Sequence, residues 1–322
     1  MKAIFHYMLC LCSIFIISCS TDNESPNPAD DNQSQNNDNV HDTFPANVRW
    51  EQLASCPISF SFNGIGDVAY DDKKIYYLVE KNKLCIYDII QNNWNVESLP
   101  YEMHSITIWN SILWGFNYPS AIVATTVKAY SYTNGQWNSY EITKPSTYSQ
   151  FFSVSDRLYN MHVSGLDSIL QEYDRDTDQW NNKTLDIYIP SSLFPIIEDE
   201  WYYVNSDPDY NHKEISLYSY NPTKNLQLRR YTIMVKGAGA YVAKYKKWIL
   251  VWNKYNPGSS GIATTYSISS YDTETNQCST TSVDGSLCFP PFSSIGSRYC
   301  ICAGDRVFVG PENSKFYEMK LL

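Results

Sequence analysis

The sequence predicts an all-β fold, a six-bladed β-propeller. A Tyr recurs at intervals of 43 to 51 residues, and a repeat of this length is typical of propeller blades. Short apolar runs separated by turn residues fill each interval, and helical spacing is absent. The chain also holds 27 Tyr, a residue that suits half-buried strands. The recurring residues are Tyr87, Tyr130, Tyr173, Tyr220, Tyr271 and Tyr317.

The first repeat shows the expected unit. Four strand-like runs cover residues 67–70, 75–79, 84–87 and 94–97, and turn residues lie between them. Runs of this length with such turns are typical of an antiparallel meander, whose strands we name a to d in chain order. Each repeat is therefore predicted to form one four-stranded blade.

The later repeats continue the pattern. Their a–b hairpins are expected at residues 106–114, 152–159, 196–203, 241–251 and 299–309. The sixth repeat stops after strand c, at Leu322, but residues 48–53 carry Trp50 in the style of a strand d. We expect this N-terminal strand to complete the last blade, because ring closure removes an exposed sheet edge.

A Trp follows the repeated Tyr by seven residues in three repeats. The pairs are Tyr87 with Trp94, Tyr130 with Trp137, and Tyr173 with Trp180. The fourth and fifth repeats lack the Trp, and Cys278 holds the aligned position in the fifth. We predict that these aromatic side chains fill the space between blades and that the Asp, Asn or Thr between them closes the c–d turn.

The stretch from Tyr173 to Trp180, Tyr-Asp-Arg-Asp-Thr-Asp-Gln-Trp, resembles the second half of a kelch repeat. The resemblance covers about residues 48–322 and implies a propeller. It departs from the family in the Gly-Gly pair after strand b, which none of the six repeats has. Copper-radical oxidases and bacterial sialic acid mutarotases are kelch-type propellers, but no motif here allows their catalytic residues to be carried over.

The first residues read as a processing signal. Lys2 precedes the apolar run 3–17, and Ile16-Ile17-Ser18-Cys19 resembles a bacterial lipobox, which implies lipidation of Cys19. The alternative is an ordinary secretory signal. We expect a signal peptide at 1–18, a flexible polar tether at 19–43 and the propeller at 44–322.

The start of the tether bears on location. Residues 20–24 resemble the acidic tract that sends some Bacteroidota-type lipoproteins to the cell surface, with a plain hydrophilic spacer as the alternative. We therefore expect an outer-membrane lipoprotein, on either leaflet, held to the membrane by its lipid anchor only.

The net charge of −10 argues against nucleic acid as a partner. Phosphate contacts need clustered Lys and Arg, and no basic stripe occurs in the sequence. The acidic surface mainly indicates solubility. The sequence gives no reason to expect a cofactor or a metal ion, and it does not indicate an oligomeric state.

The connections from strand d of one blade to strand a of the next, and from strand b to strand c, lie on the same face of a propeller. The long connections of this chain are predicted on this face, which we call the d–a/b–c face, and a functional site is expected there. Phe116 and Phe151 are among the aromatic residues expected on this face. Flat aromatics among carboxylates and amides suit sugar rings or a protein hot spot, although such aromatics can also pack under their own loops. The candidate ligand-binding residues are Arg298, His104, Tyr118, His162, Tyr210, His212 and Tyr255.

Two chemical possibilities attach to these candidates. Arg298 could clamp a carboxylate or pair with a loop Asp. Three His could bind a metal, but no ligand spacing supports this. We favour a non-catalytic propeller that binds a glycan or a protein. The alternatives are a sugar or sugar-acid enzyme, mutarotase- or lyase-like, that uses Arg298, a loop His and an Asp at the channel mouth, and a purely structural partner in a surface complex.

Six cysteines remain besides Cys19, which allows fifteen full disulfide connectivities. Cys278 and Cys288 flank one connection and could staple it, whereas Cys300 and Cys302 share a sheet face and should not pair easily. Buried free thiols are the alternative. The other two are Cys56 and Cys85.

Overall fold

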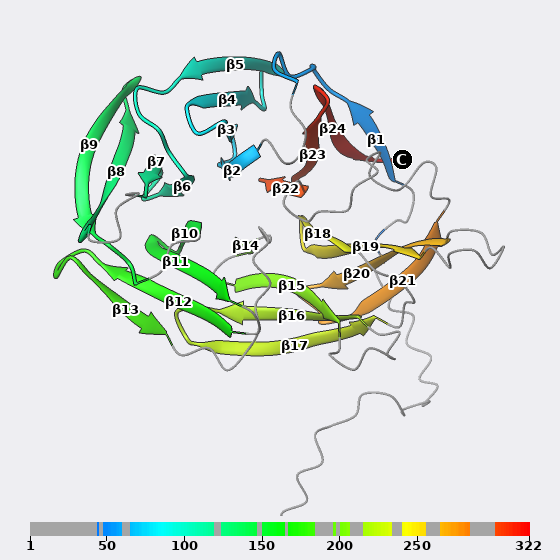
Figure 1. Ribbon diagram of the computed structural model, residues 1–322. Coiled ribbons are helices and arrows are strands. Elements are labelled where there is room, and N and C mark those ends of the chain that lie inside the picture. Colours follow the sequence, from blue (N-terminus) through cyan, green and yellow to red (C-terminus); the bar gives the residue numbers. More distant parts are fainter. Residues whose placement is uncertain are drawn as a thin grey trace, which may run out of the picture. The chain divides into compact units, whose positions relative to one another are not determined.

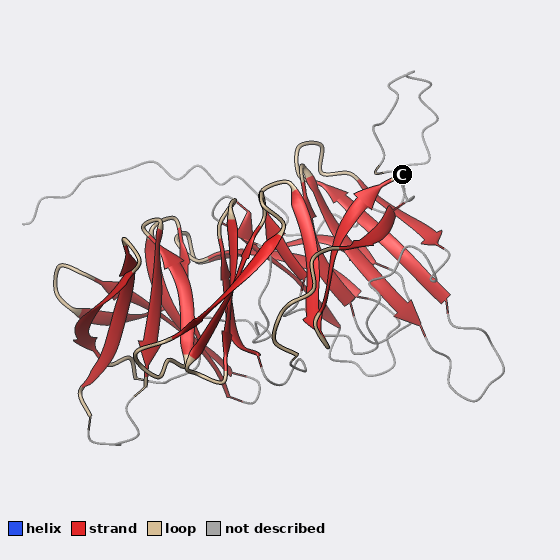
Figure 2. Ribbon diagram, turned by 90° about the horizontal axis from the view of Figure 1, so that it is seen from above, coloured by secondary structure: helices blue, strands red, loops and turns tan. Residues whose placement is uncertain are grey.

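The computed structural model forms six antiparallel four-stranded sheets arranged as the blades of a propeller (Figure 1). The described residues are 44, 48–59, 65–118, 124–146, 150–164, 167–183, 196–197, 200–206, 215–233, 240–255, 265–283 and 300–322. Cys19, the predicted signal peptide and the predicted tether lie outside them. Regular structure in the described residues is strand (Figure 2), and none of their segments is a helix long and apolar enough to cross a membrane.

Blades 1 to 3 follow one another along the chain. Blade 1 contains β2 (Ile65–Tyr70), β3 (Lys74–Val79), β4 (Lys83–Asp88) and β5 (Asn93–Ser98). Blade 2 contains β6 (Ser105–Trp109), β7 (Ile112–Asn117), β8 (Thr126–Thr133) and β9 (Gln136–Thr143). Blade 3 contains β10 (Gln150–Val154), β11 (Arg157–Ser164), β12 (Asp167–Asp174) and β13 (Gln179–Lys183).

Blades 4 to 6 complete the ring. Blade 4 contains β14 (Ile196–Ile197), β15 (Glu200–Ser206), β16 (Ile215–Asn221) and β17 (Leu226–Ile233). Blade 5 contains β18 (Ala240–Tyr245), β19 (Trp248–Tyr255), β20 (Thr265–Asp272) and β21 (Cys278–Val283). Blade 6 contains β22 (Cys300–Ala303), β23 (Arg306–Glu312), β24 (Lys315–Leu321) and, as its outer strand, β1 (Val48–Gln52).

The N-terminal strand closes the ring, as the sequence predicts. β1 pairs with β24 from Val48 opposite Leu321 to Gln52 opposite Tyr317. The contact with β24 continues one residue beyond β1, because the Leu53 amide donates to the Phe316 carbonyl at 2.9 Å. The fold is therefore a six-bladed β-propeller in which the first strand of the chain is the fourth strand of the last blade.

The hydrophobic core lies between the blades. Six clusters of buried side chains occur among the described residues, one at each boundary between neighbouring blades. In β3, Tyr77 and Val79 join the cluster shared with blade 6, whereas Tyr76 and Leu78 join the cluster shared with blade 2. A strand that is covered on both faces reads as a continuous apolar run, which explains the sequence Ile-Tyr-Tyr-Leu-Val.

The repeated Tyr and Trp build a clasp between blades. In blade 1 the Tyr87 hydroxyl donates to Asn92 Oδ1 at 2.8 Å, and the Ala54 amide donates to the same oxygen at 3.1 Å. Trp94 Nε1 donates to the Ala54 carbonyl at 2.8 Å. Ala54 lies two residues after the end of β1, so the β4–β5 hairpin of blade 1 is bonded to the chain where it leaves the outer strand of blade 6.

Blade 3 repeats this arrangement on blade 2. Tyr173 donates to Asp178 Oδ1 at 2.7 Å, the Thr143 amide donates to the same oxygen at 2.9 Å, and Trp180 Nε1 donates to the Thr143 carbonyl at 2.7 Å. The Tyr bond recurs in blades 4 and 5, at Tyr220–Asn225 and Tyr271–Asn276. The accepting Asn or Asp has φ between 50° and 58° at all four positions, a backbone region that Asn and Asp tolerate better than most residues.

Two members of the Tyr series are not equivalent to the others. In blade 2 Tyr132, not Tyr130, faces Trp137, because the two-residue turn Asn134–Gly135, with both φ positive, shortens the hairpin. In blade 6 Met319 faces Trp50, and Tyr317 lies two positions away opposite Gln52. The predicted equivalence of Tyr130 and Tyr317 with Tyr87 was therefore wrong, although the blade count was right.

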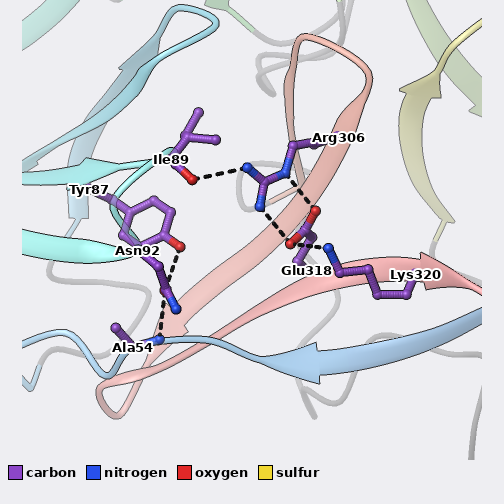
Figure 3. A network of polar contacts seen from close by, with 7 residues as sticks. All are labelled: Ala54, Tyr87, Ile89, Asn92, Arg306, Glu318 and Lys320. Carbon is purple, nitrogen blue, oxygen red and sulfur yellow. Dashed lines mark hydrogen bonds and ion pairs between the residues drawn. The ribbon is translucent and has the colours of Figure 1, made fainter.

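Figure 3 shows how polar contacts join blade 6 to blade 1. Glu318, 3% exposed, accepts Arg306 in a two-point ion pair, from Nε to Oε1 at 2.6 Å and from Nη2 to Oε2 at 2.7 Å. Lys320 Nζ adds a contact to Oε2 at 2.6 Å, and Arg306 Nη1 donates to the Ile89 carbonyl at 3.0 Å. One buried carboxylate thus organises contacts from β23, β24 and the β4–β5 turn.

Candidate functional site

A buried carboxylate ties three inner strands together where they begin. Asp67 on β2 is 6% exposed and accepts hydrogen bonds from Ser105 Oγ at 2.5 Å, from the Ile106 amide at 3.0 Å and from Gln150 Nε2 at 3.3 Å. Ser105 Oγ in turn accepts from the Phe151 amide at 3.2 Å. These bonds fix β2, β6 and β10 to one another where each strand begins. The inner strands of three blades are thereby held together on the d–a/b–c face.

The central space between the inner strands is mainly apolar. A cavity of about 230 Å³ is lined by residues of β2, β6, β10 and β22, among them Val68, Ile106, Phe152, Val154 and Ile301. Its described lining does not combine an acid, a base and a nucleophile in one place.

A polar pocket of about 630 Å³ lies on the d–a/b–c face, where blade 1 meets blade 2. We call it the His104 pocket. It receives residues from the β3–β4 turn, the β5–β6 connection, the end of β7 and the strands β8 and β9. Its lining residues are Lys81, Glu102, His104, Asn117, Tyr118, Ala124, Thr126, Lys128 and Glu141.

Contacts of both its backbone and its ring hold His104 in place. Its amide donates to the Phe116 carbonyl at 2.7 Å, and its Nδ1 accepts from the Tyr118 amide at 3.2 Å. Its ring stacks on Tyr118, with centroids 5.0 Å apart and an interplanar angle of 22°. The Tyr118 ring also contacts Phe151, at 5.7 Å between centroids, so the His104–Tyr118 wall of the pocket rests on the core between blades 2 and 3.

The protonation state of His104 follows from its surroundings. Burial and, next, the positive charge of Lys81 lower the pKa of His104 below its usual value. The imidazole is therefore neutral near pH 7. Because Nδ1 accepts a hydrogen bond, the ring proton belongs on Nε2, which makes His104 a hydrogen-bond donor at that atom.

Both signs of charge meet in the His104 pocket. Lys128 and Glu141 are cross-strand partners on β8 and β9 and both are exposed. Lys81 and Glu102 contribute one further charge of each sign. A lining with balanced charges, an amide and a hydroxyl offers several directed donors and acceptors without a strong net field, which suits a neutral polar ligand.

The structure brings together two of the seven candidate residues, His104 and Tyr118. His162 lies half-buried on β11 of blade 3, and Tyr255 is the last residue of β19. Arg298, Tyr210 and His212 lie outside the described residues. The part of the chain that the structure describes contains no group of three or more His, Cys, Asp or Glu that could hold a metal ion.

Phe116 and Phe151 belong to the core and not to a ligand surface. They are 0% and 1% exposed and stack on each other at 4.1 Å between blades 2 and 3. Their predicted place on the face was therefore wrong, because the side chains near the end of β7 and near the start of β10 point between the blades. The sequence reading also missed Lys81, Glu102, Lys128 and Glu141. Aligning the b–c turn of one blade with the d–a segment of the next would have placed Lys81 beside His104.

No family model and no curated protein matches the chain. Among solved structures, a structure titled "Kuenenia stuttgartiensis Hydrazine Synthase" is similar at 10% identity with a TM-score of 0.44, over 71% of this chain and 68% of that chain. A structure titled "Crystal Structure of Mitotic Checkpoint Complex" is similar at 10% identity with a TM-score of 0.45, over 94% of this chain and all of that chain. At these values the likenesses carry no functional argument, and the kelch resemblance stays a prediction.

Proposed function

We propose that this chain is a lipid-anchored, non-catalytic binding propeller that recognises a glycan in the His104 pocket. The observation that carries the proposal is the composition of this pocket: a concave site with paired charges, the Asn117 amide and a fixed imidazole–phenol wall. Sugar hydroxyls need several directed donors and acceptors within a short distance. A volume of about 630 Å³ is within the usual range for small-molecule sites.

The rigidity of the wall supports binding. His104 and Tyr118 are fixed by backbone hydrogen bonds and by the contact with Phe151, so little side-chain freedom is lost when a ligand enters. The neutral state of His104 also avoids the cost of taking a third positive charge out of water.

Binding can be tested on two exposed side chains that line the pocket and lie outside the hydrophobic clusters. In the full chain, Lys128→Ala and Glu141→Ala should each weaken binding to a hit from an oligosaccharide array by about tenfold, the equivalent of one lost charged hydrogen bond. Isothermal titration measures the change. The matched control is Asp176→Ala, an exposed residue of the β12–β13 turn on the opposite face, which should leave the affinity unchanged.

Two results would contradict the glycan proposal. One is an array with no glycan retained. The other is a protein, captured from the membrane fraction, whose binding is lost in the Lys128→Ala and Glu141→Ala variants, because a protein ligand would then occupy this face.

The anchor part of the proposal rests on Cys19. An acyl chain embeds with about 0.8 kcal/mol per CH₂ group, and several chains hold a protein firmly. We expect Cys19→Ser to move the chain from the membrane fraction to the soluble fraction, with the thermal midpoint of the propeller unchanged. Ser18→Ala, which keeps a small residue before the cysteine, is the control. Membrane association that survives Cys19→Ser would rule out the lipid anchor.

A further inference from the structure

Two buried cysteines lie at the boundary where the ring closes. Cys56 belongs to the segment that follows β1, and its amide donates to the Ser314 carbonyl in the β23–β24 turn at 2.9 Å. Cys85 lies on β4, opposite Tyr77 of β3 and Val96 of β5. Their exposures are 2% and 0%, and both belong to the cluster that contains Phe316 and Tyr87.

The two side chains belong to one buried cluster and share a hydrogen bond. A hydrogen bond between the two side chains is the largest influence on both thiols, and it lowers the pKa of Cys56 while it raises that of Cys85. Two cysteines from segments of different blades thus lie in one cluster whose other buried members are apolar or aromatic.

We propose that Cys56 and Cys85 form a disulfide that covalently fastens the segment closing the ring to the third strand of blade 1. Cys56 lies after the end of β1 and is bonded to the β23–β24 turn of blade 6, whereas Cys85 lies within β4 of blade 1, so the bond would join the two blades. The proposal is independent of the proposed glycan binding.

The oxidant is a thiol–disulfide reagent, such as a protein or small-molecule disulfide. The Cys56 thiolate attacks one sulfur of this disulfide, forms a mixed disulfide and expels the first thiolate. The Cys85 thiolate then attacks the Cys56 sulfur and expels the second thiolate. The two protons lost by the cysteines pass to the two leaving thiolates, so two electrons and two protons leave the chain.

The order of events follows from burial. A reagent cannot reach sulfurs that are 2% and 0% exposed, so exchange must take place before blade 6 packs against blade 1. The bond would close a loop of about 30 residues and restrict the unfolded chain. A reduced, folded chain should accordingly react far more slowly than an unfolded one.

The test refolds the denatured, reduced full chain in a mixture of reduced and oxidised glutathione. After alkylation under denaturing conditions and proteolysis, mass spectrometry should find the Cys56 and Cys85 peptides joined and two hydrogen atoms lighter than the separate pair. Reduction should lower the thermal midpoint by about 5–10 °C. Alkylation of both residues in the refolded chain would overturn the proposal.

Variants separate the bond from other effects of reduction. In Cys56→Ala and in Cys85→Ala, reduction should no longer shift the midpoint by this amount. Cys278→Ser, a half-buried cysteine on β21, is the matched control and should keep both the joined peptides and the shift. Cys56→Ala serves alone if the fully buried Cys85 site does not tolerate replacement. A full shift that persists in Cys56→Ala would also overturn the proposal.

Discussion

Trp180→Ala should lower the free energy of unfolding by about 3 kcal/mol. Trp180 packs against Tyr173 and Phe151, with ring centroids 5.1 Å and 5.6 Å away. Its Nε1 also donates to the Thr143 carbonyl of blade 2. The substitution removes both the inter-blade packing and the clasp bond. Urea unfolding followed by circular dichroism measures the loss.

Trp180→Phe separates the contribution of the hydrogen bond from that of packing, and Ile90→Ala is the control for an exposed apolar side chain. Trp180→Phe keeps most of the ring but removes the Nε1 donor, so it should cost about 1 kcal/mol. Ile90→Ala, at a side chain that is 77% exposed in the β4–β5 turn, should change stability by less than about 0.5 kcal/mol. If Trp180→Ala were as stable as the parent chain, the role assigned to the repeated Trp would be wrong.

Glu318→Gln should lower the free energy of unfolding by about 3 kcal/mol at neutral pH. The Glu318 side chain is 4% exposed and accepts contacts from Arg306 and Lys320. Removing its charge takes away the ion-pair partner of Arg306 and Lys320 and leaves a nearly buried neutral side chain between them. The same urea titration measures the loss.

The pH dependence of stability gives an independent measure. Burial raises the pKa of Glu318, but the hydrogen bonds from Arg306 and Lys320 outweigh it and hold the pKa below the usual 4.5. A carboxyl with a lowered folded-state pKa binds fewer protons when folded. Its stabilisation is therefore complete above about pH 4.5 and is lost as the pH falls through the folded-state pKa.

Glu318→Gln should remove this part of the acid dependence. The control is Glu80→Gln, in an exposed ion pair with Lys83, which should change stability by less than about 0.5 kcal/mol. An unchanged acid profile in Glu318→Gln would show that other carboxyls govern acid unfolding.

The fold could be predicted because every blade repeats the same local signals. Apolar runs of strand length, short turns between them and an unmatched strand at 48–53 together indicated a closed ring of six sheets. Which Tyr faces the Trp across a c–d hairpin could not be predicted where the turn of that hairpin changed length. Asn134–Gly135 shortens one hairpin by two residues, and a fixed seven-residue spacing then points to Tyr130 in place of Tyr132.

The candidate site was harder to predict because it depends on which connections meet. His104 and Tyr118 could be placed on one face from the order of strands. Lys81 and Glu141 come from other connections and strands, and their convergence needs the twist of two neighbouring blades. Phe116 and Phe151 show the opposite error, since an aromatic at the end of a strand is core when its side chain points between blades.

The pairing of β1 with β24 also sets the order in which the molecule can be completed. β1 is made early, yet its partner β24 follows the strands of all the other blades in the chain, so blade 6 cannot assemble until β24 has been synthesised. Until then β1 is an open edge that can pair with other chains. A chain interrupted before β24 would leave β1 and β23 as exposed edges, because β24 is the strand that lies between them.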